Sequence, residues 1–152
     1  MALNTQDAIL LVEDSGDDIA LMRYAFRKAG VPNLIFEVHD GEEAIDYLKG
    51  AGRFADREQY PLPCLIITDL KMPKVNGFEL LEWLCGQPEF SRVPKLVLSS
   101  SAIEADKVRA AKLGAGAYFV KPNDIQELVK VVLYIDEEWI SEHCPLPKAS
   151  SS

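Results

Sequence analysis

Polar residues able to do chemistry follow directly after several short apolar runs of this sequence. They are Glu13 and Asp14 after run 8–12, Asp69 after run 64–68, Ser99 at the end of run 95–99, and Lys121 after run 117–120. Taken singly, each has an ordinary explanation as a loop, turn, helix-approach or surface residue. Their recurrence at the ends of four runs is harder to explain in that way and favours one shared site.

The chemistry of such a site would depend on its three carboxylates. Two unit negative charges about 4 Å apart repel by about 4 kcal/mol at an effective dielectric of 20, so the cluster needs a cation or a raised pKa. Oxygen ligands favour a hard ion, and Mg²⁺ suits a site that combines one or two carboxylates with waters and phosphate oxygens. The Lys121 ammonium cannot bind a metal, but it can pair with a phosphate.

These residue types support transfer of a phosphoryl group to a carboxylate. Asp69 would attack in line, Mg²⁺ and Lys121 would neutralise the equatorial oxygens, and Ser99 would donate a hydrogen bond to one of them. An aspartate needs no general base for this step, since its carboxyl group is already ionised at pH 7.

The elements that would position these residues can be predicted from the same runs. The runs 8–12, 34–38, 64–68, 95–99 and 117–120 are apolar at consecutive positions, which is typical of strands covered on both faces. Stretches with helical spacing alternate with them, and helix-start signals stand at Ser15, Asp40–Gly41 and Asn76–Gly77. The alternation predicts an α/β fold, a doubly wound five-stranded parallel sheet with its site at the carboxyl ends of the strands.

Composition restricts the partners and the location. The 152 residues fit one domain, which can bury roughly 70% of the surface of its unfolded chain. The net charge of −8, without a dense basic block, argues against a nucleic-acid partner. The opening segment has neither a basic region nor an apolar run long enough for a signal peptide or a membrane span. Three widely spaced cysteines argue against a zinc site or disulfide framework, so we expect a cytoplasmic protein.

Four motifs together resemble the receiver domain of two-component response regulators. They are "LLVED", "LIITDLKMPKVNGFELL", the hydroxyl in "LVLSSS", and "GAGAYFVKP", in that order. The resemblance covers residues 7–140 and implies the (βα)5 flavodoxin-like receiver fold with five helices, followed by a C-terminal tail at 141–152. We therefore expect a stand-alone signalling receiver without a further domain, and not an enzyme acting on other substrates.

The resemblance implies a role for each residue of the predicted site. Asp69 takes the position of the phosphoacceptor, while Asp14 and Glu13 take that of the acidic pair that serves Mg²⁺. The backbone carbonyl of Lys71, two residues beyond the acceptor, would be a further metal ligand.

Other positions match the family's switch and its loops. Ser99 takes the place of the switch hydroxyl, Tyr118 that of the aromatic switch, and Lys121 that of the phosphate-pairing lysine. The family commonly has a cis bond between that lysine and the next proline, so Lys121–Pro122 is the candidate here. The expected loop-shaping residues are Pro73, Gly77 and Pro122.

The resemblance also implies partners. A histidine kinase would deliver the phosphoryl group. The long connection 50–63, with "YLKG" before it and "GQPEFSRVPKLVLSSS" after it, is similar to receivers associated with phytochrome-type kinases. The last helix has a second apolar face, with Val131, Tyr134 and Glu138. This face is either an ordinary scatter of exposed apolar residues or the interface of a homodimer.

Two other functions compete with a phosphorylated receiver. A pseudo-receiver would bind partners without phosphorylation, although such modules commonly lose some of the site residues that are intact here. A haloacid-dehalogenase-like phosphatase also uses an aspartate nucleophile, but its DxD motif is missing, because Leu70 and Lys71 follow Asp69.

Overall fold

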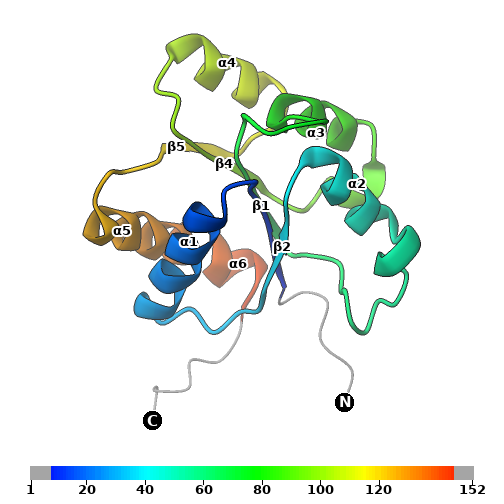
Figure 1. Cartoon of the computed structure of the whole chain (residues 1–152), viewed down its shortest axis with the longest axis horizontal. Helices are drawn as coiled ribbons and strands as arrows, with labels where there is room; N and C mark the ends of the chain where they lie inside the picture. Colours follow the sequence, from blue (N-terminus) through cyan, green and yellow to red (C-terminus); the bar gives the residue numbers. More distant parts are fainter. Residues whose placement is uncertain (1–7, 146–152) are drawn as a thin grey trace.

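The computed structural model describes residues 8–145, and a five-stranded parallel sheet lies at its centre (Figure 1). The strands are β1 (Ile9–Val12), β2 (Ile35–Val38), β3 (Leu65–Thr68), β4 (Lys95–Ser99) and β5 (Ala117–Val120). Their order in the sheet is β2-β1-β3-β4-β5, and every neighbouring pair is parallel. The predicted strands and the predicted doubly wound sheet are therefore confirmed.

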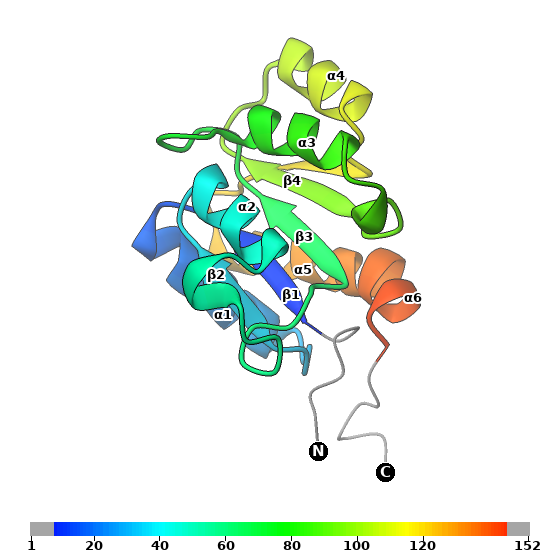
Figure 2. The same cartoon turned by 90° about the vertical axis from the view of Figure 1, so that its right-hand side faces the viewer.

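Helices cover both faces of this sheet (Figures 1 and 2). On one face α1 (Gly16–Lys28) packs against α5 (Ile125–Ile135). On the other face α3 (Gly77–Cys85) lies between α2 (Gly41–Lys49) and α4 (Glu104–Lys112) and contacts both. These are the five expected helices. Short turns η2 (Gly52–Phe54) and η3 (Pro88–Phe90) lie in the connections, and the π-helical turn η4 (Asp136–Ile140) and α6 (Ser141–His143) extend α5.

The strand order determines where a site can form. From β1 the chain passes to β2 on one side, whereas β3 pairs with β1 on the other side, so the crossovers diverge between β1 and β3. A crevice opens at such a divergence, outside the carboxyl ends of the strands. Val12 and Thr68 are register partners at those ends, so the residues that follow them must lie close together.

Strand β1 is buried on both faces. Ile9 and Leu11 belong to the core beneath α1 and α5, whereas Leu10 and Val12 belong to the core beneath α2 and α3. Side chains alternate between the two faces of a strand, and here both faces are covered by helices. This explains why the run is apolar at every position and shows no alternation.

Side-chain caps begin the first three helices where the sequence predicted them. The side chains of Ser15, Asp40 and Asn76 accept hydrogen bonds from the third amide of α1, α2 and α3, at 3.2, 2.7 and 2.9 Å. Each cap satisfies an amide that has no partner within its helix. The caps of α1 and α3 also close the loops that lead from β1 and β3 around the crevice, a short loop at 13–15 and a longer one at 69–76.

The long connection 50–63 is tied to α2. The Arg57 guanidinium donates hydrogen bonds to the carbonyl oxygens of Tyr47 and Leu48, both at 2.8 Å, and of Tyr60 at 3.1 Å. The Tyr47 hydroxyl donates to the Pro61 carbonyl at 2.8 Å. These bonds satisfy carbonyls at the C-terminus of α2, so the connection is packed despite its length.

The cysteines correct one prediction. Cys64 and Cys144 form a disulfide, with their Cα atoms 5.6 Å apart, while Cys85 is free and exposed. The expectation of no disulfide was wrong because the two residues are separated by 80 positions, and only the fold brings the start of β3 beside the end of α6. The cysteines therefore no longer support a reducing compartment.

The predicted C-terminal tail begins inside the packed structure. Residues 141–143 form α6, and Cys144 is buried, so residues 141–144 belong to the fold. Residues 146–152 lie outside the described part of the chain, and a tail there stays a prediction. Within residues 8–145, no helix has the length and apolar character needed to span a bilayer.

Gly77 is required by a close backbone approach. Its amide donates to the Leu70 carbonyl at 2.9 Å, and a Cβ at this position would meet the Asp69 carbonyl oxygen and lie 2.8 Å from the Leu70 Cα. We expect Gly77→Ala to lower the free energy of unfolding by about 1–3 kcal/mol, because backbone must shift to admit the methyl group. Urea unfolding measures this. Gly16→Ala is the matched control, since Gly16 also begins a helix but has nothing within 4 Å of its Cβ position.

The disulfide predicts a defined pattern of thiol reactivity. Without reductant, iodoacetamide in urea should label one cysteine, Cys85, whereas after reduction it should label all three. Reduction should also lower the free energy of unfolding by about 2–4 kcal/mol, since the bond closes a long loop. Cys85→Ser should leave this reduction effect unchanged, and Cys144→Ser should abolish it. Labelling of three cysteines without reductant would contradict the bond.

Candidate functional site

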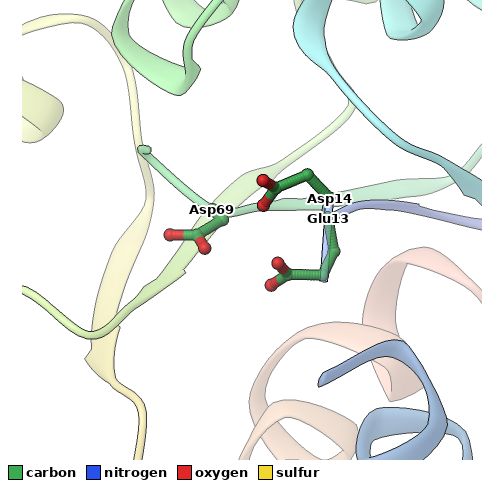
Figure 3. A group of neighbouring side chains, drawn as sticks. All are labelled: Glu13, Asp14 and Asp69. Carbon is green, nitrogen blue, oxygen red and sulfur yellow. The ribbon is translucent and has the colours of Figure 1, made fainter. Parts of the chain in front are cut away.

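Three carboxylates meet at the crevice between β1 and β3 (Figure 3). Glu13 and Asp14 leave the end of β1, and Asp69 leaves the end of β3. One oxygen from each side chain lies within 4.8 Å of the others. Glu13 and Asp69 are buried, while Asp14 is exposed, so the group is open to ligands on one side.

The ammonium of Lys121, just after β5, completes the group. Its Nζ lies 2.7 Å from Glu13 Oε1, 2.9 Å from Asp69 Oδ2 and 2.7 Å from Asp18 Oδ2. The backbone amide of Lys121 donates to the Ser99 carbonyl at 2.8 Å, which fixes the start of the side chain beside β4. The long stem then reaches past β4 to the ends of β3 and β1.

Burial and charge together set the protonation of the site. Burial raises the pKa of the Glu13 carboxyl to about 7, against the opposing effects of hydrogen bonds from Lys121 and the Ser15 amide, and the charge of Asp69 adds to the rise. Burial would lower the pKa of the Lys121 ammonium, but hydrogen bonds to Asp18, Asp69 and Glu13 outweigh it, so this pKa is raised. Lys121 is therefore a permanent cation within the site.

Asp69 is held through both of its carboxylate oxygens. Oδ1 accepts a hydrogen bond from the Leu70 amide at 2.6 Å, and Oδ2 accepts one from Lys121. The Asp69 amide donates to the Val12 carbonyl at 3.0 Å, which continues the β1–β3 ladder by one residue. The strand therefore aims this carboxylate, and its neighbours keep it in a single orientation.

Ser99 and Tyr118 lie beside the site and share the loop after β4. Ser99 is fully buried, and its Oγ accepts a hydrogen bond from the Ser101 amide at 3.2 Å. The half-buried Tyr118 donates its hydroxyl to the Ser101 carbonyl at 2.8 Å. Ser101 itself donates to Asp106 Oδ2 at 2.6 Å. Both predicted switch residues therefore contact one loop, through Ser101.

The remaining predicted residues lie in the loops around the crevice. Lys71 and Pro73 are exposed in the connection from β3 to α3, which ends at the buried Gly77. Pro122 follows Lys121, but no peptide bond in residues 8–145 is cis, so the predicted cis Lys121–Pro122 bond is wrong. A trans bond is the intrinsic preference before proline, and Lys121 makes all of its contacts with it.

Asp18 was not among the predicted site residues, yet it pairs with Lys121 as closely as Glu13 does. It is the third residue of α1, and no apolar run ends there, so the argument from strand ends could not find it. A signal was present nevertheless. An acidic residue in the first turn of a helix that begins at the crevice must lie near the same edge of the sheet.

The donor set fits a hard divalent cation. Glu13, Asp14 and Asp69 offer oxygen atoms alone, which are the ligands that such ions prefer, and their spacing allows a shared ion. Their negative charge, together with that of Asp18, exceeds the single positive charge of Lys121. A cation would therefore relieve the repulsion that remains.

Comparison with known proteins agrees with this geometry. The family model described as response regulator receiver domain matches residues 9–133. The response regulator Rcp1 of Synechocystis is 32% identical over 146 residues, which cover 96% of this chain and 97% of Rcp1. The chain is thus similar to a response regulator along nearly its whole length.

Solved structures of response regulators are also similar to this chain. The phosphorylated cyanobacterial phytochrome response regulator RcpA has a TM-score of 0.81 and 35% identity, with 90% of this chain and 95% of that chain covered. The Mn²⁺-bound form of Rcp1 has a TM-score of 0.78 and 32% identity, covering 88% and 94%. The regulator RPA3017 in red light signalling of R. palustris has a TM-score of 0.83 and 27% identity, covering 95% and 99%. Sequence and structure together show that this chain belongs to the response regulators, as a receiver domain similar to those of phytochrome systems.

Proposed function

We propose that Asp69 accepts a phosphoryl group from the phosphohistidine of a histidine kinase. The observation that carries this proposal is the position of its carboxylate, aimed by β3 into the acidic crevice and bound there by Lys121 at 2.9 Å. In the transfer, a bond forms between an Asp69 oxygen and phosphorus, and the phosphorus–nitrogen bond to imidazole breaks. The electron pair of that bond remains on the leaving imidazole nitrogen.

The chain's own residues orient and neutralise the incoming group. The Leu70 amide binds one Asp69 oxygen and keeps the carboxylate from turning. The Lys121 ammonium, now shared among three carboxylates, would bind an equatorial phosphoryl oxygen and offset its charge. The enclosed strand end limits access of water to the buried Asp69.

Mg²⁺ is the metal we propose for the acidic group. Glu13, Asp14 and Asp69 would hold it, together with the carbonyl of Lys71, and it would supply charge neutralisation between the acceptor and the phosphoryl oxygens. It suits this role because it binds through few carboxylates and keeps positions for phosphate oxygens. Manganese occupies the related Rcp1 structure named above, which supports a divalent ion of similar chemistry.

Ser99 and Tyr118 would change their contacts when Asp69 is phosphorylated. The new group brings a charge of about −1.5 to −2 and three acceptor oxygens. A Ser99 hydroxyl that turns toward them would lose its bond to the Ser101 amide, and Ser101 is also the acceptor for Tyr118. The loop from β4 to α4 would then shift its population between two arrangements, which changes the surface offered to partners.

The kinase is proposed to be of the phytochrome type, because proteins named for phytochrome or red-light signalling recur among the similar structures. Such a kinase presents its phosphohistidine in the cytoplasm, so we place this receiver there as well. It would act as a signalling partner that promotes only its own phosphorylation and dephosphorylation. The runner-up is a pseudo-receiver, which the complete set of site residues disfavours.

Acetyl phosphate provides the direct test of phosphorylation. With Mg²⁺, intact mass spectrometry should show the gain of one phosphoryl group, and EDTA should prevent it. Asp69→Asn should reduce labelling at least 100-fold, because an amide is a very weak nucleophile beside a carboxylate. Asp17→Asn, an exposed aspartate on α1, should keep full labelling. Absence of labelling in the wild type, or equal labelling of Asp69→Asn, would instead favour the pseudo-receiver.

The outer face of α5 carries a second proposal, an isologous homodimer. Tyr134 is 52% exposed and its ring packs edge-on against Phe119, while Val131 is half-buried and also packs against the core. Glu138 is exposed as well, but it lies in the following turn η4. A large apolar ring that remains exposed on an amphipathic helix favours a partner surface.

Sedimentation velocity tests this dimer. Wild type with beryllofluoride and Mg²⁺ should sediment as a dimer, whereas Tyr134→Asp should shift the dimerisation constant at least tenfold toward the monomer, because it buries a charge at the interface. Tyr24→Asp is the matched control, since Tyr24 is a 41% exposed tyrosine on α1. A monomer under all conditions, or equal effects of the two substitutions, would rule out dimerisation through α5.

A further inference from the structure

The Lys121 ammonium has three N–H donors, and carboxylates accept all of them. Two of these carboxylates, Glu13 and Asp69, belong to the group that can hold a metal. The third, Asp18, lies 2.7 Å from Nζ and is not part of that group. A metal bound to the acidic group would therefore compete with Lys121 for the oxygens of Glu13 and Asp69, but not for those of Asp18.

Asp18 is held in place by the start of α1. Its backbone amide donates to the Ser15 cap at 3.2 Å, and it stands at the third position of the helix, where its side chain reaches the carboxyl edge of the sheet. The side chain is 35% exposed, so its carboxylate stays hydrated on one side while it binds Lys121 on the other. The Asp18 carboxylate therefore does not shield the Lys121 ammonium from water, but it can hold that ammonium in one place.

We infer that Asp18 is a positioning residue for phosphoryl transfer, which holds the Lys121 ammonium beside Asp69 from the α1 side. This inference rests on the function proposed for Asp69. When a metal engages Glu13 and Asp69, their hold on Lys121 weakens, because their oxygens then also serve the cation. Asp18 keeps the flexible lysine stem from swinging into solvent, so that Nζ is already in place for the incoming phosphoryl oxygens.

Asp17 offers a matched control for this inference. It precedes Asp18 in the first turn of α1 and carries the same charge, but it is exposed and forms no ion pair with Lys121 in the described chain. Asp17→Asn therefore removes a negative charge near the site without removing the contact. Any effect of charge alone on metal or phosphate binding should be similar in the two variants.

The first experiment measures the rate of phosphorylation by acetyl phosphate over a range of Mg²⁺ concentrations up to saturation. We expect Asp18→Asn to slow it about 5- to 10-fold, the effect of losing one partly exposed charge-assisted hydrogen bond, and Asp17→Asn to change it less than about twofold. The loss should appear in the maximal rate and not in the concentration of Mg²⁺ needed. Equal effects of the two variants would overturn the inference.

A double-mutant cycle separates positioning from general support of the fold. In a Lys121→Met background, Asp18→Asn should cause no further loss of rate, because the group it positions is gone. Urea unfolding of the same four proteins in EDTA should show that Asp18 and Lys121 are coupled without any metal. An undiminished effect of Asp18→Asn in the Lys121→Met protein, or an absent coupling, would overturn the inference.

The outcome also distinguishes the two proposals. If the wild type is labelled on Asp69 and Asp18→Asn is labelled at the same rate, the positioning role fails while the proposed function stands. If the wild type takes no label at all, the proposed function fails, and the positioning role fails with it.

Discussion

The ion pairs between Lys121 and its carboxylate partners are the interactions on which the site depends. Glu13 and Asp69 are buried acidic groups that would repel each other strongly without a cation between them. Lys121 supplies that cation at 2.7 to 2.9 Å and remains charged because its partners raise its pKa. One positive charge does not balance four nearby carboxylates, so the protein is left with a site that attracts further cations.

This charge arrangement is possible only because the sheet brings separate strand ends to one edge. Val12 and Thr68 are register partners, so the acids that follow them are neighbours, and β5 lies two strands away from β3. A lysine has the reach to cross that distance, whereas a shorter cationic side chain would not. The close packing of Gly77 against Asp69 and Leu70 then brings the start of α3 directly against the acceptor.

The two edges of the sheet are constructed differently. At the amino edge, the Cys64–Cys144 disulfide joins two distant segments, and the Arg57 hydrogen bonds tie the connection 50–63 to the end of α2. At the carboxyl edge, the loop after β4 is held by hydrogen bonds that converge on Ser101, from the side of Ser99 and from Tyr118. A few hydrogen bonds are easier to exchange than a covalent link or a packed core, so we expect the loop after β4 to rearrange more readily than the segments at the amino edge.

The sequence by itself determined the fold and most of the site. Consecutive apolar residues in five runs require strands covered on both faces, and caps such as Ser15 and Asn76 mark where helices begin, so the strand ends and their polar residues were predictable. Only the tertiary structure decided the position of Asp18 beside Lys121 and the pairing of Cys64 with Cys144. Local patterns reflect propensity and periodicity, whereas these two features depend on which distant atoms the packed chain brings within a few ångströms of each other.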